Sequence, residues 1–276
     1  MNPAVHEDLS PAQRSAVDRA FSKQSDHYDE EDSANPILQD MRRQVYAHVH
    51  KYLGPDDSIL ELNAGTGIDA LYFARMGHRV HATDISTGMI SQIKSKIESN
   101  DLQDRVTCQQ VSYDQLINVN EQKFDYAFSN FGGLNCIQDL SNVTKYLPSL
   151  LNAGAHITFV IMPPLYLWEL LWVLKGDTKQ AFRRLHKGGV KAHLEGEFFR
   201  TYYHSLQDIK KAFGPQFQFI RTEGLCCLSP PPSPKEFSVR HPRVYRLLRK
   251  MDSIVRLTFP FNRWADHLIV TFKLVN

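Results

Sequence analysis

The segment SILELNAGTGIDA, residues 58–70, constrains the fold more than any other part of the chain. It runs from an apolar strand pattern, through a turn that contains Gly65 and Gly67, into the start of a helical pattern. A glycine turn between a buried strand and a helix lets bare backbone approach a ligand closely, as in doubly wound α/β sheets. Glu61 places a carboxylate just before this turn.

The rest of the chain continues the alternation that such a sheet requires. Short apolar runs predict seven strands, at 58–62, 79–83, 106–111, 124–129, 156–162, 217–222 and 267–275. Amphipathic segments between them predict helices at 67–76, 87–99, 139–151 and 206–213. Strands that alternate with helices predict an α/β fold with a Rossmann-like, doubly wound, mostly parallel sheet of seven strands.

Three stretches fall outside this alternation, and we expect them to form helical caps on a single domain that spans residues 1–276. They are an N-terminal cap at 1–55, which is helical over 10–53, and two insertions at 163–200 and 224–263. The first insertion follows a strand at its carboxyl end, which is the ligand side of such sheets. We therefore expect the caps to close over a ligand.

The two insertions carry patterns with more than one interpretation. Trp168 and Trp172 either pack in the core or form the wall of a site for a bulky apolar substrate. Residues 242–257 predict an amphipathic helix with many arginines. Such a helix usually docks by its apolar side, and contact with a membrane surface is the less favoured alternative.

Composition argues against several classes of protein. A content of 42% hydrophobic and 22% charged residues is ordinary for a globular protein, and we expect a cytoplasmic location. A net charge of +2 is too small to indicate nucleic-acid binding. The four cysteines form no CxxC pair, which favours reduced thiols. The twelve histidines form no HExxH motif or other metal-ligand pattern, so no metal is expected.

The ligand of the glycine turn is narrowed by two carboxylates. G-x-G-x-x-A at residues 65–70 is shared with nicotinamide and flavin binding and is weak by itself. Glu61 would repel a pyrophosphate but suits S-adenosylmethionine, which carries a sulfonium and an ammonium. Asp84, at the end of HRVHATD, can accept hydrogen bonds from both hydroxyls of a ribose, which supports an adenosine ligand.

ILELNAGTG, followed by ATDIS-x-x-M, resembles the class I S-adenosylmethionine-dependent methyltransferases over residues 20–162. The resemblance implies that the turn from Asn63 through Ala64 and Gly65 to Gly67 lines the methionine part of the cofactor. It also implies that Glu61 orients that part, directly or through water. Asp84 would then hold the ribose, with Ile85 and Met89 against the adenine. Asn63 stands where the family has its first glycine, and asparagine tolerates the positive φ of such a turn.

Three further segments extend the resemblance. In VTCQQVSYDQL, Ser112 stands where many relatives carry an adenine-binding Asp, with Tyr113 beside it and Asp114 as a substitute. In FDYAFSNFGGLNC, Asn130 and Phe131 leave a strand where the methyl group is presented. FSKQSDHYDE resembles the start of quinone-biosynthesis-type and small-molecule methyltransferases, which implies that Tyr28 covers the cofactor. Independently, Arg42 or Arg43 offers a fork for the cofactor carboxylate.

The predicted function is methyl transfer from S-adenosylmethionine to a medium-sized, hydrophobic small molecule, with O- or C-methylation favoured. The alternatives are an NAD(P)-dependent oxidoreductase and a non-catalytic S-adenosylmethionine-binding relative. His27 and His204 are the candidates for a general base, which is needed only if the acceptor must lose a proton. The sequence leaves the acceptor and the oligomeric state open.

Overall fold

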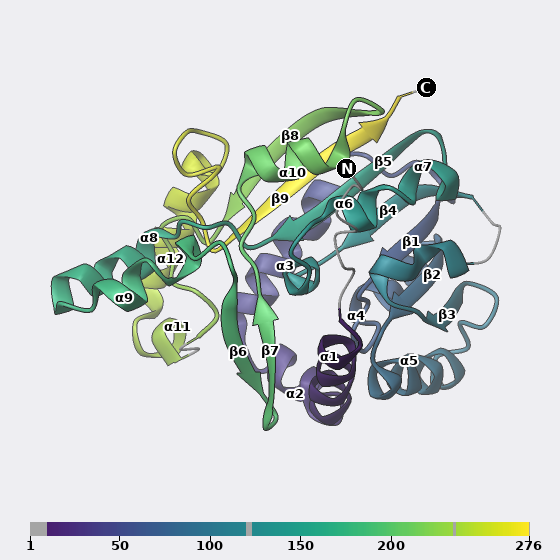
Figure 1. Cartoon of the computed structure of the whole chain (residues 1–276), viewed down its shortest axis with the longest axis horizontal. Coiled ribbons are helices and arrows are strands. Elements are labelled where there is room, and N and C mark those ends of the chain that lie inside the picture. The colour runs from purple at the N-terminus through teal and green to yellow at the C-terminus, as the bar shows by residue number, and fades with distance from the viewer. Residues whose placement is uncertain (1–9, 120–122, 234–235, 276) are drawn as a thin grey trace, which may run out of the picture.

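The computed structural model describes residues 10–119, 123–233 and 236–275 (Figure 1). Its main sheet has the strand order β3-β2-β1-β4-β5-β9-β8. The strands are β1 Ser58–Leu62, β2 Arg79–Asp84, β3 Val106–Gln110, β4 Phe124–Ser129, β5 Leu151–Ile161, β8 Phe217–Leu225 and β9 His267–Leu274. Strands β1 to β5 pair in parallel, and β9 runs antiparallel between β5 and β8. This confirms the predicted seven-stranded, mostly parallel sheet.

The strand order reverses beside β1, which pairs with β2 on one side and with β4 on the other. Leu62 at the end of β1 is level with Thr83 and with Ser129 in these neighbours. The segments that follow the three strands therefore begin at the same edge of the sheet. In doubly wound folds a ligand binds at this reversal, outside the carboxyl ends of the strands.

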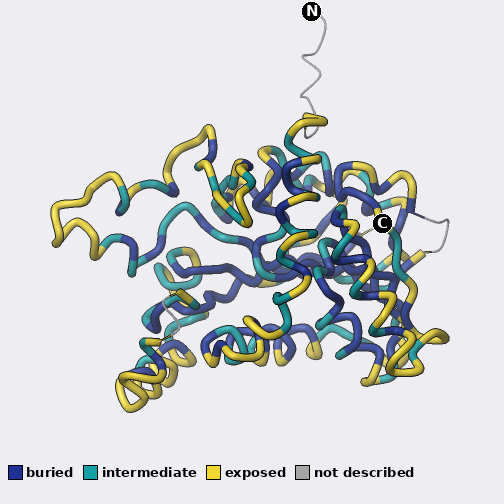
Figure 2. The backbone as a smooth tube through the Cα atoms, turned by 90° about the horizontal axis from the view of Figure 1, so that it is seen from below, coloured by how far each residue is buried: buried dark blue, intermediate teal, exposed yellow. Residues whose placement is uncertain are grey.

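Apolar side chains from both faces of the sheet form the core. Leu60 and Leu62 of β1 pack into a cluster on one face, whereas Ile59 packs into a cluster on the other. The second face is covered by helices α3 Pro36–Val49, α4 Ile68–Arg75 and α5 Thr87–Ser99. The first is covered by helices α6 Ser141–Thr144, α7 Leu147–Leu150 and α10 Leu206–Phe213, and by the 3-10 helix η1 Tyr113–Asn118. Figure 2 shows the resulting buried interior and exposed rim.

The N-terminal cap is three helices where the sequence predicts one helical stretch. They are α1 Pro11–Gln24, α2 Tyr28–Ser33 and α3. Pro36 has no N–H to continue a preceding helix, and the side chain of Asn35 accepts from the N–H groups of Ile37 and Leu38. The chain therefore ends one helix and starts the next at this point.

The first insertion contains a hairpin, so the expectation of a purely helical cap is wrong. Short helices come first, namely α8 Leu167–Leu170, η3 Leu171–Lys175, α9 Thr178–Ala181 and η4 Arg183–Leu185. Strands β6 Val190–Leu194 and β7 Glu197–Thr201 follow and pair antiparallel. Glu195 and Gly196 between them both have positive φ, as a two-residue hairpin turn requires. The hairpin lies beside α1 (Figure 1).

The second insertion also leaves the sheet at its carboxyl edge, because the end of β8 and the start of β9 are level with the end of β5. It contains α11 Glu236–Arg240 and α12 Pro242–Val255. Tyr245 of α12 packs in the core cluster of α3 and donates a hydrogen bond to Asp40. The expected docking of α12 by its whole apolar side is wrong, because Val244, Leu247, Met251 and Ile254 are exposed. Among the described residues, no helix is long and apolar enough to cross a membrane.

Candidate cofactor and acceptor site

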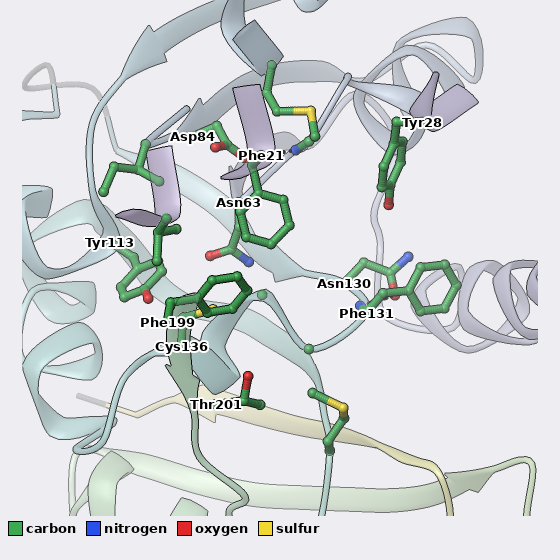
Figure 3. Close-up of a pocket in the computed structure, with 17 residues that line it drawn as sticks. Phe21, Tyr28, Asn63, Asp84, Tyr113, Asn130, Phe131, Cys136, Phe199 and Thr201 are labelled. Carbon is green, nitrogen blue, oxygen red and sulfur yellow. Dashed lines mark hydrogen bonds between the residues drawn. The ribbon is translucent and has the colours of Figure 1, made fainter. Parts of the chain in front are cut away.

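A cavity of about 240 Å³, here called the main cavity, opens where β1, β2 and β4 end (Figure 3). Eight of the predicted cofactor residues line it: Tyr28, Asn63, Gly65, Asp84, Ile85, Met89, Tyr113 and Asn130. A smaller side cavity adjoins the main cavity. Ala64, Arg42 and Asp69 line this side cavity but not the main one. The structure therefore brings together residues that the sequence places in separate motifs.

The glycine turn has the backbone that its sequence predicts. Asn63, Gly65 and Gly67 have φ values of 48°, 57° and 81°, so Asn63 does adopt the positive φ expected of it. Asn63 donates a hydrogen bond to Ser129, and Gly133 packs against it. A Cβ atom on Gly133 would lie 2.4 Å from Asn63 Nδ2, so this contact requires glycine. Gly67 starts α4 and supports the turn from outside both cavities.

Asp84 is a buried carboxylate on the wall of the main cavity. Its Oδ2 accepts the Gly65 N–H at 2.9 Å, and its Oδ1 accepts the Ser86 N–H at 2.8 Å. Burial raises the pKa of Asp84 to about 6, although these two N–H groups oppose the shift. Each oxygen of a carboxylate has two acceptor positions, so Asp84 can still accept from a pair of hydroxyls.

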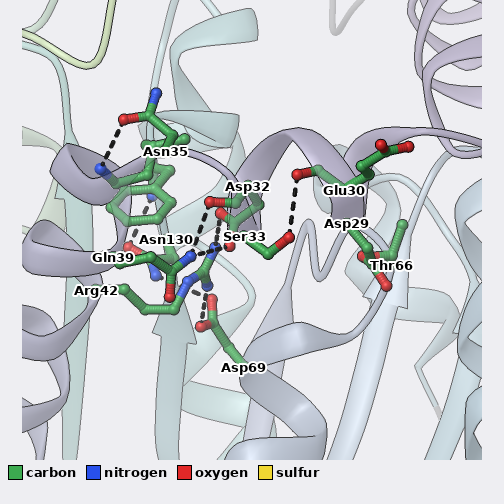
Figure 4. A network of polar contacts seen from close by, with 12 residues as sticks. Asp29, Glu30, Asp32, Ser33, Asn35, Gln39, Arg42, Thr66, Asp69 and Asn130 are labelled. Carbon is green, nitrogen blue, oxygen red and sulfur yellow. Dashed lines mark hydrogen bonds and ion pairs between the residues drawn. The ribbon is translucent and has the colours of Figure 1, made fainter. Parts of the chain in front are cut away.

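Arg42 lies on the side cavity, but its guanidinium group is already engaged (Figure 4). Nη2 donates to Asp32 at 2.7 Å, and Nη1 pairs with Asp69. Asp69 also accepts from Tyr46 and from the side-chain amide of Asn130. Arg43 instead points to solvent and pairs with Asp40. The sequence offered Arg42 or Arg43, and the structure brings Arg42 to the site.

Asp69 is a site residue that sequence reasoning missed. It occupies the fifth position of G-x-G-x-x-A, in the first turn of α4, where its side chain reaches α3 and the end of β4. Its carboxylate fixes Arg42 and Asn130 at once. The available signal was that Asp69 is an acidic residue in the first turn of a predicted helix. Such a residue stabilises the positive end of the helix dipole.

Glu61 is buried below both cavities and lines neither. Its Oε2 has no hydrogen-bond partner among the described residues. Burial and the nearby charge of Asp69 raise the pKa of Glu61 well above its usual value, and Arg42 opposes them. A buried carboxyl without a partner is costly, and a cation held above it would lower that cost. This observation fits a cationic ligand, while contact with Glu61 stays a prediction.

Ser112 is not on the wall of the main cavity, but it lines a neighbouring cavity together with Ile85, so its role as an adenine contact stays a prediction. Its hydroxyl donates a hydrogen bond to Asp114, and Asp114 pairs with Arg14 at 2.7 Å. Tyr113 reaches the main cavity instead, and its hydroxyl has no partner among the described residues. Of the three neighbouring residues, Tyr113 is therefore the one on the wall of the main cavity.

Neither predicted base candidate lines either cavity. His204 is buried 3.0 Å from the carbonyl oxygen of Ile137, and burial lowers its pKa to about 4. His27 lies at the start of α2, where its Nε2 is 3.3 Å from Glu195. The sequence placed both histidines near expected site segments, but it could not show which way their rings point.

Neither tryptophan lines either cavity, so their role as a substrate wall stays a prediction. Trp168 donates its indole N–H to the carbonyl oxygen of Leu228 at 2.8 Å and packs edge-on against Phe237. Trp172 is partly exposed beside Lys175. The contacts of Trp168 join the two insertions to each other.

Helix α1 and the hairpin β6–β7, here called the roof, cover one side of the main cavity. Phe21 of α1 and Phe199 of β7 both line it, with ring centroids 5.8 Å apart (Figure 3). Ser22 of α1 accepts a hydrogen bond from the backbone N–H of Gly88, and a Cβ atom on Gly88 would lie 2.7 Å from the Cα of Ser22. The roof therefore touches the start of α5 with no space between them.

Ion pairs join the two parts of the roof. Arg19 and Lys23 of α1 each lie 3.0 Å from the carboxylate of Glu197 in β7. The segment that begins at Phe21 was expected to cover the cofactor, but sequence reasoning missed the other roof residues on the cavity wall, namely Val17, Phe199 and Thr201. The alternating pattern EFFRT was the available signal for β7, because every second side chain of a strand faces the same way.

An aspartate–histidine dyad, which sequence reasoning did not single out, lies behind the wall of the main cavity, and neither of its residues lines either cavity. His267, the first residue of β9, has its Nδ1 3.0 Å from Asp266 Oδ2. Arg184 pairs with the other oxygen of Asp266 at 2.9 Å. Burial favours protonation of Asp266, but His267 and Arg184 hold its pKa well below the usual range. A Cβ atom on Gly132, a residue of the cavity wall, would lie 3.4 Å from Nε2 of His267.

Comparisons with known proteins agree on the kind of fold that carries this site. Residues 59–154 match a family model described as a methyltransferase domain. A search of curated protein sequences found no match. Among solved structures, the chain is similar to the CcbJ methyltransferase from Streptomyces caelestis, with a TM-score of 0.60 and 15% identity over 93% of this chain and 98% of that one.

Two further solved structures have ligands in their descriptions. One is the 1,6-didemethyltoxoflavin-N1-methyltransferase from Burkholderia thailandensis with its substrate and S-adenosylhomocysteine, at a TM-score of 0.56 and 16% identity over 99% of this chain and 94% of that one. The other is the geranyl diphosphate C-methyltransferase from Streptomyces coelicolor A3(2). Its TM-score is 0.53, and the identity is 15% over 85% of this chain and 79% of that one. At these identities the likeness concerns the fold.

Proposed function

We propose that this chain, a class I S-adenosylmethionine-dependent methyltransferase, methylates an apolar small molecule held between the floor of the main cavity and its roof. One observation carries the proposal. The cavity has polar groups where β1 and β2 end and aromatic side chains under α1 and β7. When bound, the cofactor supplies an electrophilic methyl group on a sulfonium, so the protein has mainly to position an acceptor and exclude water.

The floor residues suit the donor. We assign Asp84 to the two ribose hydroxyls, with Ile85, Met89 and Tyr113 around the adenine. The turn at Asn63, Ala64 and Gly65 would face the methionine part, beside Tyr28 and Arg42. Burial raises the pKa of Tyr28 to about 12, so its hydroxyl remains a hydrogen-bond donor at neutral pH. The unpartnered oxygen of Glu61 below this end favours a ligand with an ammonium group.

The roof side of the cavity suits an apolar acceptor of modest size. Phe21, Phe131, Met162 and Phe199 supply aromatic and thioether surface, and Thr201 supplies one hydroxyl. Ligand sites of this kind bury most of a small molecule and orient it through a few polar groups. The described substrates of two similar structures, 1,6-didemethyltoxoflavin and geranyl diphosphate, are small molecules as well.

We assign the Asp266–His267 dyad as the proton acceptor for a hydroxyl or an acidic carbon. Nδ1 of His267 donates to Asp266, which leaves Nε2 free to accept a proton. As the acceptor atom bonds to the methyl carbon, its proton passes to Nε2, and Asp266 stabilises the imidazolium that forms. Arg184 fixes Asp266 on its other side, so the imidazole ring is oriented before the acceptor arrives.

The first experiment separates a methyltransferase from an oxidoreductase. Isothermal titration of the full chain with S-adenosylmethionine, and separately with NADPH, should show binding of the first alone. Labelled methyl donor is then incubated with fractionated apolar metabolites, and methylated products are identified by mass spectrometry. Binding of NADPH without S-adenosylmethionine would contradict the assignment. Cofactor binding without product from any fraction would favour the non-catalytic alternative.

The acceptor side has a matched pair of residues on one strand. Phe199 lines the main cavity, whereas its neighbour Phe198 is exposed on the other side of β7. Phe199→Ala should raise the KM for the acceptor by about tenfold, because it removes most of one aromatic contact. Phe198→Ala should leave KM unchanged. Equal effects would show that the acceptor does not lie under β7.

The dyad is tested by its pH profile. His267→Asn should reduce kcat and remove the acidic limb of its pH dependence, while the dissociation constant of the cofactor stays the same. The control is His204→Asn, because the ring of His204 is buried against the carbonyl oxygen of Ile137, away from Gly132 and Asp266. If His267→Asn retains the wild-type pH profile, the dyad is structural, and methyl transfer needs no base from the protein.

A further inference from the structure

Helix α12 exposes an apolar row that nothing in the described chain covers. Tyr245 and Asp252 are its buried residues, and Tyr245 packs toward α3. Val244, Leu247, Met251 and Ile254 recur at helical spacing on the exposed side, and Leu247 and Ile254 are 60% and 69% exposed. Leu257 and Phe259 continue the exposed surface after the helix ends. Contiguous apolar surface of this kind marks an interaction site in a folded protein.

Basic side chains surround this apolar row. Residues 236–263 contain seven arginines and lysines and only two acidic residues, Glu236 and Asp252. Asp252 is buried, where it accepts hydrogen bonds from Ser229 and the N–H of Leu228. The exposed basic residues are Arg240, Arg243, Arg246, Arg249, Lys250 and Arg263, of which Arg249 pairs with Asp40 of α3 at 2.6 Å. The surface is therefore both apolar and strongly positive.

A second exposed apolar cluster lies at the same end of the molecule. It belongs to η3 and the residues after α9, and includes Leu171, Trp172, Leu174, Phe182 and Leu185. Lys175, Lys179 and Lys187 are exposed among these residues. Helices α8, α9, α11 and α12 all lie at one end of the longest axis of the molecule (Figure 1). We call the two clusters together the end surface.

We propose that the end surface docks on an anionic lipid membrane. Lipids offer acyl chains to the apolar row and negatively charged headgroups to the basic residues around it, and amphipathic helices with basic flanks bind membranes in this way. Each lysine or arginine near such a surface strengthens binding by about fivefold. Trp172 fits the same setting, because indole rings favour the boundary between lipid and water.

The charge of the end surface favours a membrane over a second copy of this chain as its binding partner. A symmetric dimer through the end surface would place the basic residues of one copy against those of the other. Like charges brought together across an interface oppose association. The lipid surface supplies the negative charge that a second copy lacks, so the observed charge favours it.

The test uses the full chain and vesicles of defined composition. Flotation with phosphatidylcholine vesicles containing about one third phosphatidylglycerol should recover the protein about tenfold better than flotation with phosphatidylcholine alone. Leu247→Glu/Ile254→Glu should lower this recovery by at least about tenfold, since it places two acids in the apolar row. The matched control is Met76→Glu/Ile117→Glu, because these residues are 57% and 71% exposed elsewhere on the molecule.

A second pair of variants tests the charges. Arg243→Gln/Arg246→Gln should weaken binding by about fivefold for each side chain, and raised salt should weaken the wild type in the same direction. Arg79→Gln/Lys94→Gln, which removes two exposed charges elsewhere, should have no effect. Thermal unfolding midpoints within about 2 °C of wild type would show that each variant is folded.

Three results would overturn the proposal. One is equal recovery with neutral and anionic vesicles. Another is an equal loss of binding in the control Met76→Glu/Ile117→Glu. The third is a wild-type dimer in light scattering that Leu247→Glu/Ile254→Glu converts to monomer, because the end surface would then join two copies of the chain. None of these measurements depends on which acceptor is methylated.

Discussion

The floor and the roof of the main cavity are built in different ways. The floor consists of the segments that follow β1, β2 and β4, where carboxylates meet backbone N–H groups and an arginine in a buried network. The roof consists of α1 and the hairpin β6–β7, which meet through phenylalanines and exposed ion pairs. Floor contacts are polar and enclosed, so removing one leaves a buried group without a partner. Roof contacts are apolar or reach water, so their loss is milder.

The largest expected effect of a floor substitution is on stability. Asp69→Ala leaves Arg42, Tyr46 and Asn130 without their shared partner, and breaking a buried ion pair on one side costs about 3 kcal/mol. Urea unfolding followed by circular dichroism measures this free energy. The control is Arg43→Ala, which removes an exposed member of a surface pair and should cost under about 1 kcal/mol. If Asp69→Ala lowers the free energy of unfolding by as little as Arg43→Ala does, the floor contacts contribute no more to stability than surface ion pairs do.

The next effect is on cofactor affinity. Asp84→Ala removes charge-assisted hydrogen bonds to the ribose and should weaken S-adenosylmethionine binding by about 1.5–3 kcal/mol. Isothermal titration measures the change, and Asp104→Ala, an exposed carboxylate away from the cavity, serves as the control. An unchanged dissociation constant in a folded Asp84→Ala variant would place the ribose elsewhere.

The pH dependence of the same contact is smaller and has a definite sign. Burial raises the pKa of Asp84 to about 6, and the ionised form is the one that accepts from both hydroxyls. Affinity for the cofactor should therefore fall about tenfold for each pH unit below about 6 and level off above it. The stability of the free protein has the opposite pH dependence. A raised pKa of Asp84 in the folded state stabilises the fold at low pH, and this contribution to the free energy of unfolding disappears as the pH rises through about 6.

Isothermal titrations with S-adenosylmethionine between pH 5 and pH 8 test the predicted dependence of cofactor affinity on pH. Asp84→Asn should abolish this dependence in that range. If the variant keeps the wild-type slope, another group controls the pH dependence of binding.

The smallest effect is expected in the roof. Glu197→Gln removes the charge that pairs with Arg19 and Lys23, which are about half exposed. It should raise the KM for the acceptor by no more than about threefold and make this KM less sensitive to salt. Steady-state assays at low and high ionic strength measure the difference. A large effect on cofactor affinity would show that the roof also holds the donor.

Local patterns were sufficient to predict the floor. The bounds of β1, β4, α5 and α10 agree with the predicted 58–62, 124–129, 87–99 and 206–213. The positive φ of Asn63 and the wall positions of Asp84, Ile85 and Met89 followed from two short motifs. Each of these features depends on residues close in sequence, at the period of a strand or helix.

Features that join distant segments could not be predicted. Arg42 meets Asp69 across 27 positions, and Trp168 bonds to Leu228 across 60, so their partners are invisible to a local pattern. The docked side of α12 was mistaken because Tyr245 and Asp252, rather than the aliphatic row, face the protein. His267 was overlooked because its carboxylate partner is its own neighbour in sequence, while Gly132, which it lies beside, is far from it in sequence.

The contact between Ser22 and Gly88 has a consequence for the timing of turnover. Because α1 rests on backbone that bears no side chain, it cannot tilt toward α5 to make room, and it can move only outward with the hairpin that holds it. If the demethylated cofactor leaves under α1, we expect its departure to depend on this outward movement. A rapid burst of methylated product, followed by slower steady cycles, is the kinetic signature of an exit step that lags behind the chemistry.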